Sequence, residues 1–184
     1  RIAMKPAEMF SITADDGHRF EASLHATADP TAPVLLFLPA LGTPGRVYRG
    51  FATALAAQGV QVCITDWRGM ASSSVRASRK HNHGYQTLVE TDVTALLAQL
   101  ARRVPQAALW VGGHSLGGQL ATLLAARQSP PVRGLVLVAS GSVYRRCYSP
   151  GLQIGIRFLG LMAAITGALI GHFPGRRFGF GGRE

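Results

Sequence analysis

The segment Gly113-His114-Ser115-Leu116-Gly117 places a serine between two glycines, each two residues away from it. An apolar run over residues 107–111 predicts a strand before this segment, and the pattern of residues 116–127 predicts a helix after it. Glycine at these two positions permits a sharp turn from strand to helix, because larger side chains would collide with the neighbouring elements. Such a turn exposes the serine hydroxyl beside the positive end of the helix. The segment therefore predicts that Ser115 is a catalytic nucleophile.

A serine nucleophile needs a histidine that takes its proton and an acid that orients the histidine. After Ser115 the sequence holds one histidine, His172, and one acid, Glu184. Neither follows a predicted strand of the sheet, and we do not expect His172 to act as the base. His114 adjoins the nucleophile, but its side chain is expected to leave the turn in another direction. We expect the acid and the histidine to lie outside these 184 residues, so that this stretch alone is inactive.

The elements that must position Ser115 alternate between strands and helices. Residues 8–26 predict a β-hairpin with Asp16-Gly17 at its turn, because glycine accepts the positive φ of a tight turn. Alternating strands and helices form a parallel sheet with helices on both faces. The expected strands then cover residues 34–38, 60–65, 109–111 and 132–139, and the expected helices cover residues 47–59, 88–104 and 116–127. Apolar side chains expected on one face of a helix are Val47, Phe51 and Leu55 in the first, and Leu120, Leu123 and Leu124 in the last.

Composition favours one globular domain, with 47% hydrophobic and 15% charged residues. The net charge of +10 comes from basic residues scattered along the chain rather than from a basic stripe with aromatics, so nucleic acid is not expected as a partner. We expect Cys63 and Cys147 to form neither a disulfide framework nor a metal site. Residues 1–14 lack the apolar core of a secretory signal, so we expect none there. His81 and His83 are too few ligands for a metal. We expect a cytoplasmic location and no cofactor.

Three segments together resemble the α/β-hydrolase superfamily, in particular its serine aminopeptidase and monoglyceride-lipase-like branch. They are Leu38-Pro39-Ala40-Leu41-Gly42, Asp66-Trp67-Arg68-Gly69 and the segment around Ser115. The resemblance implies an oxyanion hole made by the backbone N–H groups of Leu41 and Leu116. The family normally carries His-Gly where this chain has Pro39-Ala40. In the family an acid and then a histidine follow the nucleophile on two further core strands, so the resemblance implies that those C-terminal strands lie outside these 184 residues. Asp66 and Asp92 precede the nucleophile, and we expect them to be structural.

An apolar run over residues 151–173 follows the predicted core. In the family that the chain resembles, this position holds a helical cap that lines the substrate pocket. We therefore expect the N-terminal portion of a hydrolase core in residues 1–144 and the start of a cap in residues 145–184. A membrane-inserted helix is the alternative, since a span needs about 20 apolar residues. Gln153, Arg157 and Thr166 interrupt the run.

These patterns together predict a serine hydrolase that cleaves an ester or an amide bond of a small hydrophobic substrate. The reaction is expected to pass through an acyl-enzyme on Ser115. An acyltransferase of the same fold remains open, because it shares the acyl-enzyme and differs only in the second acceptor. A non-catalytic domain that keeps the fold for binding or membrane attachment also remains open. The oligomeric state is not indicated by any pattern.

Overall fold

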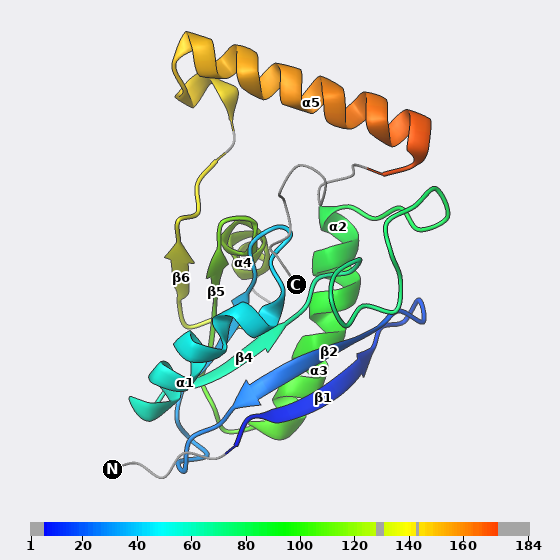
Figure 1. Cartoon of the computed structure of the whole chain (residues 1–184). Coiled ribbons are helices and arrows are strands. Elements are labelled where there is room, and N and C mark those ends of the chain that lie inside the picture. Colours follow the sequence, from blue (N-terminus) through cyan, green and yellow to red (C-terminus); the bar gives the residue numbers. More distant parts are fainter. Residues whose placement is uncertain (1–5, 128–130, 143, 173–184) are drawn as a thin grey trace.

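The computed structural model describes residues 6–127, 131–142 and 144–172, and a six-stranded sheet forms its centre (Figure 1). The strand order is β1-β2-β4-β3-β5-β6. β1 and β2 form the predicted antiparallel hairpin, and β2 also runs antiparallel to β4, whereas the other neighbours are parallel. The strands are β1 (Glu8–Thr13), β2 (Arg19–His25), β3 (Val34–Leu38), β4 (Gln61–Thr65), β5 (Leu109–His114) and β6 (Leu135–Val138).

Helices connect the parallel strands, as the alternation of elements predicts. The middle connection is longer than expected: it begins before residue 88 and contains one stretch of wider, π-type turns. The helical elements are η1 (Gly45–Tyr48), α1 (Arg49–Ala57), α2 (Tyr85–Thr87), η2 (Leu88–Val93), α3 (Thr94–Arg103), α4 (Leu116–Ala126), η3 (Arg145–Cys147) and α5 (Pro150–Ile170). The predicted architecture, a mostly parallel sheet with helices on both faces, is confirmed.

Two apolar layers lie on opposite faces of the sheet. Successive side chains of a strand point to opposite faces, and β3 shows this alternation clearly. Leu35 and Phe37 pack with Ala52 of α1, whereas Leu36 and Leu38 belong to the layer formed with α3 and α4. All five residues of β3 are buried. The end of this doubly covered strand therefore offers a rigid base for the loop that follows it.

The buried face of α1 differs from the predicted one. Val47 lies in η1 and is 63% exposed, and Phe51 is 37% exposed, whereas Ala52 and Ala56 are buried. Small alanines let the helix backbone approach the sheet closely, so the larger Phe51 packs at the periphery against Phe37, with ring centroids 4.7 Å apart. In α4, where Leu120, Leu123 and Leu124 are expected on one face, only Leu120 and Leu124 are buried.

Leu123 is 48% exposed, because α4 contacts the sheet through Leu120, Ala121 and Leu124.

The segment from residue 131 onward packs least. β6 is shorter than the predicted strand over residues 132–139, and none of its residues is buried. α5 is a single helix that passes over one end of the sheet, and none of its residues is buried either (Figure 1). Its length and composition suffice to cross a membrane. A helix therefore lies in the segment where the start of a cap is expected, and its role as a cap stays a prediction. Residues 173–184 of that segment lie outside the described residues.

Candidate active site

Ser115 lies at the turn between β5 and α4, with φ 52° and ψ −114°. A positive φ is strained for a residue with a side chain, and such strain gathers at functional sites. The Ser115 N–H donates to the carbonyl of Val138 at 3.0 Å, and the Ser140 hydroxyl donates to the Ser115 carbonyl at 2.9 Å. The surrounding backbone therefore holds the serine in this conformation.

The two flanking glycines leave no room for a side chain. A Cβ on Gly113 would lie 2.5 Å from the Leu38 carbonyl oxygen, and a Cβ on Gly117 would overlap the same oxygen. The turn of α4 thus packs directly on the backbone at the end of β3. The sharp strand-to-helix turn predicted from these glycines is present.

One predicted oxyanion donor, Leu41, lies in the loop after β3, and the other, Leu116, lies at the start of α4. Leu116 is the first residue of α4, so its N–H has no acceptor within the helix. Leu41 lies in a turn closed by a 3.1 Å hydrogen bond from the Thr43 N–H to the Ala40 carbonyl, with Gly42 at φ 74°. Among the hydrogen bonds between described residues, none uses the N–H of Leu41 or of Leu116. Both groups are therefore available to a ligand.

Two aromatic side chains absent from the predicted site contact the loop after β3. The indole N–H of Trp67 donates to the Pro39 carbonyl at 2.8 Å, and the Tyr48 hydroxyl accepts from the Ala40 N–H at 3.0 Å. Trp67 belongs to the Asp-Trp-Arg-Gly segment, which could have drawn attention to it. Tyr48 carries no such signal, because it follows Val47 in a short turn of ordinary composition.

Asp66 and Asp92 hold loops, as expected for structural residues. Asp66 accepts from the Gly45 N–H at 2.7 Å, and it also accepts from the N–H and the hydroxyl of Ser72. These contacts join the loop after β4 to the start of η1. Asp66 thereby braces the segment that carries Tyr48.

A buried ionic network also holds the loop after β4. Asp92, almost fully buried, accepts from Arg68 at 2.6 and 3.0 Å, and Arg68 also binds Asp16 of the hairpin. The hydrogen bond from Arg68 lowers the pKa of Asp16. His18 lies between Asp92, at 3.1 Å, and the hydroxyl of Ser73, at 2.9 Å. The network ties the hairpin turn and η2 to the loop after β4.

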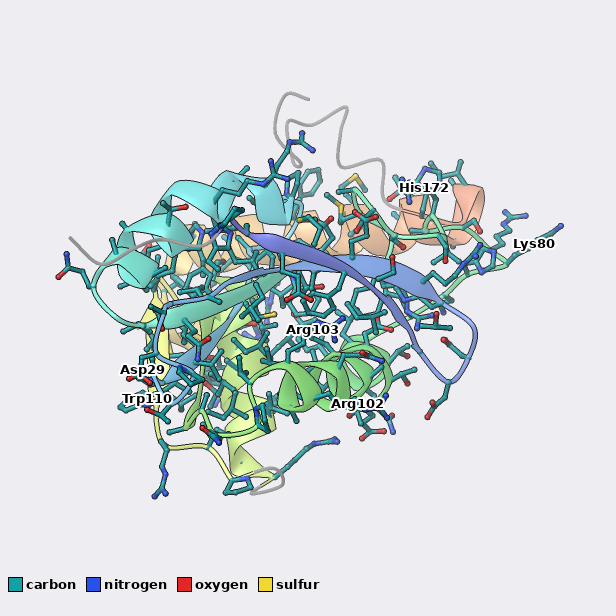
Figure 2. The ribbon with its side chains drawn as sticks, turned by 90° about the horizontal axis from the view of Figure 1, so that it is seen from below. Asp29, Lys80, Arg102, Arg103, Trp110 and His172 are labelled. Carbon is teal, nitrogen blue, oxygen red and sulfur yellow. The ribbon has the colours of Figure 1, made fainter. Side chains whose placement is uncertain are left out.

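No described histidine is placed to take the proton of Ser115. His114 Nδ1 lies 3.0 Å from the Tyr48 hydroxyl, so this side chain leaves the turn toward the loop after β3, as expected. His172 follows the exposed end of α5, on the same side of the molecule as Lys80 and opposite Trp110 (Figure 2). Glu184 lies outside the described residues. Within residues 6–127, 131–142 and 144–172, no side chain is hydrogen-bonded to the Ser115 hydroxyl.

Other reactive side chains do not form a rival site. In the described part of the chain, no three residues among His, Cys, Asp and Glu could share a metal ion. Burial raises the pKa of the Cys63 thiol to about 12, so this thiol is not a nucleophile at neutral pH. A cavity of about 490 Å³ lies beside η1 and a second, of about 550 Å³, lies near the C-terminal end of α3. Ser115 lines neither cavity.

Comparison with known proteins assigns the family. Residues 29–174 match the family model described as serine aminopeptidase, S33. The chain is 31% identical over 141 residues to a pimeloyl-[acyl-carrier protein] methyl ester esterase of Vibrio atlanticus, a match that covers 77% of the chain and 49% of that protein.

Solved structures agree on the fold. An α/β-hydrolase from Novosphingobium aromaticivorans is 29% identical, with a TM-score of 0.61, over 73% of this chain and 45% of that one. A thermostable carboxyl esterase from Bacillus coagulans has a TM-score of 0.64 at 20% identity, over 72% of this chain and 44% of that one. The chain therefore spans about half the length of the relatives it matches. It belongs to the serine aminopeptidase S33 family of α/β-hydrolases.

Proposed function

We propose that the complete protein, encoded by the whole gene, is a serine hydrolase that cleaves an ester or an amide bond of a small hydrophobic substrate. The observation that carries this proposal is the positive φ of Ser115 at a strand-to-helix turn whose glycines cannot bear side chains. A strained, exposed serine beside a helix N-terminus is the arrangement that nucleophilic serine hydrolases use. The family match supports the same reaction class.

The chemistry follows from this geometry. The Ser115 oxygen attacks the substrate carbonyl carbon, while its proton passes to a histidine of the complete protein. The N–H groups of Leu41 and Leu116 then bind the negative oxygen of the tetrahedral intermediate. Collapse of the intermediate breaks the bond to the alcohol or amine, which leaves with the proton, and the acyl group stays on Ser115. Water attacks the acyl-enzyme in the same way, releasing the acid and regenerating the serine.

The substrate class is inferred from α5 and from the relatives. α5 presents mostly apolar side chains over one end of the sheet, as a cap above a hydrophobic substrate would. The Vibrio relative is named for a methyl ester substrate, which favours an ester over an amide. We place the enzyme in the cytoplasm, and the proposal needs no metal or organic cofactor.

The exposed α5 also favours one second candidate, a domain without catalysis that uses this helix to attach to a membrane. None of the residues of α5 is buried among the described residues, and its composition would suit lipid. This candidate needs no reaction at Ser115. Covalent labelling of the serine therefore separates the two.

The test is labelling of the complete protein with a fluorophosphonate, which reacts with activated serines. The proposal predicts rapid labelling that Ser115→Ala abolishes, whereas the control Ser11→Ala, at an exposed position of β1, labels like the parent. Equal labelling of Ser115→Ala and the parent would refute Ser115 as the nucleophile. Products formed with an alcohol present would show whether the acyl group passes to water or to a second acceptor.

A further inference from the structure

One peptide unit at the end of β3 is held at both of its polar atoms. The carbonyl of Pro39 accepts from the Trp67 indole at 2.8 Å, and the N–H of Ala40 donates to the Tyr48 hydroxyl at 3.0 Å. These two atoms belong to the same planar peptide group. Two side chains on opposite edges of a plane prevent it from rotating. The backbone that enters the loop after β3 therefore has one fixed orientation.

The next peptide unit carries the N–H of Leu41. Its carbonyl, from Ala40, accepts from the Thr43 N–H at 3.1 Å. In a trans peptide the N–H points away from the carbonyl, so the direction of the Leu41 N–H follows from this turn and from the held plane before it. The Trp67 and Tyr48 contacts thereby also help to fix the direction of the Leu41 N–H.

Tyr48 also contacts the residue that precedes the nucleophile. Its hydroxyl lies 3.0 Å from Nδ1 of His114, the residue that precedes Ser115, and its ring packs against Phe37 with centroids 5.3 Å apart. The hydroxyl accepts from the Ala40 N–H and at the same time lies within hydrogen-bond distance of His114 Nδ1, because a hydroxyl can make more than one hydrogen bond. One oxygen thus connects the loop after β3 to the strand end that carries Ser115.

From these contacts we infer that Tyr48 is a positioning residue for the oxyanion hole, with Trp67 as its counterpart on the other edge of the peptide. The inference rests on the proposed function, because it assigns Leu41 as a donor to the reacting oxygen. Among the described residues, the Tyr48 hydroxyl is hydrogen-bonded to Ala40 and His114 and not to Ser115. Its role is to set the distance and direction between the Leu41 N–H and the nucleophile.

The test compares Tyr48→Phe with the parent in the complete protein, since phenylalanine keeps the ring and removes the hydroxyl. With a p-nitrophenyl ester, kcat falls about tenfold while KM changes less than twofold, because the donor acts only in the transition state. Affinity for a trifluoromethyl ketone, which forms an oxyanion on the serine, weakens by a similar factor. Exchange of the Ala40 amide, followed by NMR, accelerates. Tyr85→Phe, at an exposed tyrosine of α2, is the matched control and leaves all three unchanged.

A Tyr48→Phe variant with parental kcat and parental ketone affinity would overturn the inference. The inference would also be overturned if kcat fell only in proportion to the fraction of folded protein, while the folded molecules bound the ketone as tightly as the parent. That result would indicate a purely structural role for the hydroxyl. An inactive parent that is not labelled at Ser115 would instead refute the proposed function. In that case the amide exchange of Ala40 still shows whether the hydroxyl holds the loop. Trp67→Phe is expected to act in the same direction.

Discussion

β3 and β6 are both short apolar strands of the same sheet, yet one is fully buried and the other is open to solvent. All five residues of β3 are buried, whereas Leu135, Leu137 and Val138 of β6 are 40 to 50% exposed. β3 pairs with β4 and β5 and is covered by helices on both faces, while β6 pairs only with β5 within the described residues. Apolar sequence thus predicts a strand, but neighbours on every side decide whether it is buried.

Ser115 lies where these two regions meet. Its flanking glycines pack against the end of β3, while its own N–H donates to Val138 at the end of β6. The buried strand β3 leads into the loop that carries Leu41, and the exposed strand β6 accepts a hydrogen bond from the backbone of Ser115. The contrast between the two sides can be tested with the same kind of substitution in each.

The largest effect is expected from alanine at Gly117. The new Cβ would overlap the Leu38 carbonyl oxygen, and neither backbone can withdraw from a doubly covered strand, so the substitution should lower the free energy of unfolding by about 3 kcal/mol. Urea unfolding of the complete protein measures this loss.

Gly155→Ala in α5 is the matched control, because a Cβ there would meet no atom of the described residues within 4 Å. Alanine favours a helix over glycine by about 0.5–1 kcal/mol, so amide exchange within α5 should slow and global stability should not fall. Equal destabilisation by both substitutions would contradict the contrast between a packed core and an open α5.

A similar loss is expected when the buried ionic network is broken. Asp92→Asn keeps the size of the side chain but removes the charge that faces Arg68 and His18. The guanidinium then keeps only the more exposed Asp16 as a charged partner, so the loss of the buried charge should cost about 3 kcal/mol in the free energy of unfolding.

The comparison variant is Glu90→Gln, which removes the exposed ion pair with Arg127 and should cost less than about 1 kcal/mol. Chemical denaturation of both variants measures the difference. If Asp92→Asn were as stable as Glu90→Gln, the network would not brace the loop after β4.

A smaller effect on the free energy of unfolding is expected when the pH is lowered. Burial lowers the pKa of His25, with a further contribution from the charge of Arg49, and its Nε2 has no hydrogen-bond partner among the described residues. Burial also lowers the pKa of His83. The folded state therefore binds fewer protons than the unfolded state. Stability that is present above the ordinary histidine pKa of about 6.5 should be lost as the pH falls toward the lowered values.

Urea unfolding between pH 8 and pH 5 tests this expectation. His25→Gln should reduce the slope of stability against pH below about 6.5, whereas His81→Gln, at an exposed loop position, should not change it. An unchanged slope in His25→Gln would remove the contribution assigned to this residue.

The features readable from the sequence are those with local causes. Alternating residues predict the hairpin, a continuous apolar run predicts β3, and the glycines at positions 113 and 117 predict the strand-to-helix turn. The buried face of α1 is not readable in this way, because η1 shifts the helix and alanines rather than Phe51 approach the sheet. The site contacts of Tyr48 and Trp67 join residues 8 and 28 positions apart, and no local period records such contacts.

The central claim, that Ser115 carries an acyl group during turnover, is tested most directly by trapping the intermediate. The complete protein is mixed with p-nitrophenyl butyrate, quenched in acid within the first turnover and digested for mass spectrometry. The account predicts a butyryl group on the peptide that contains Ser115, together with a burst of nitrophenol equal to the enzyme concentration. Turnover without a burst, with the peptide unmodified and Ser115→Ala equally active, would contradict it.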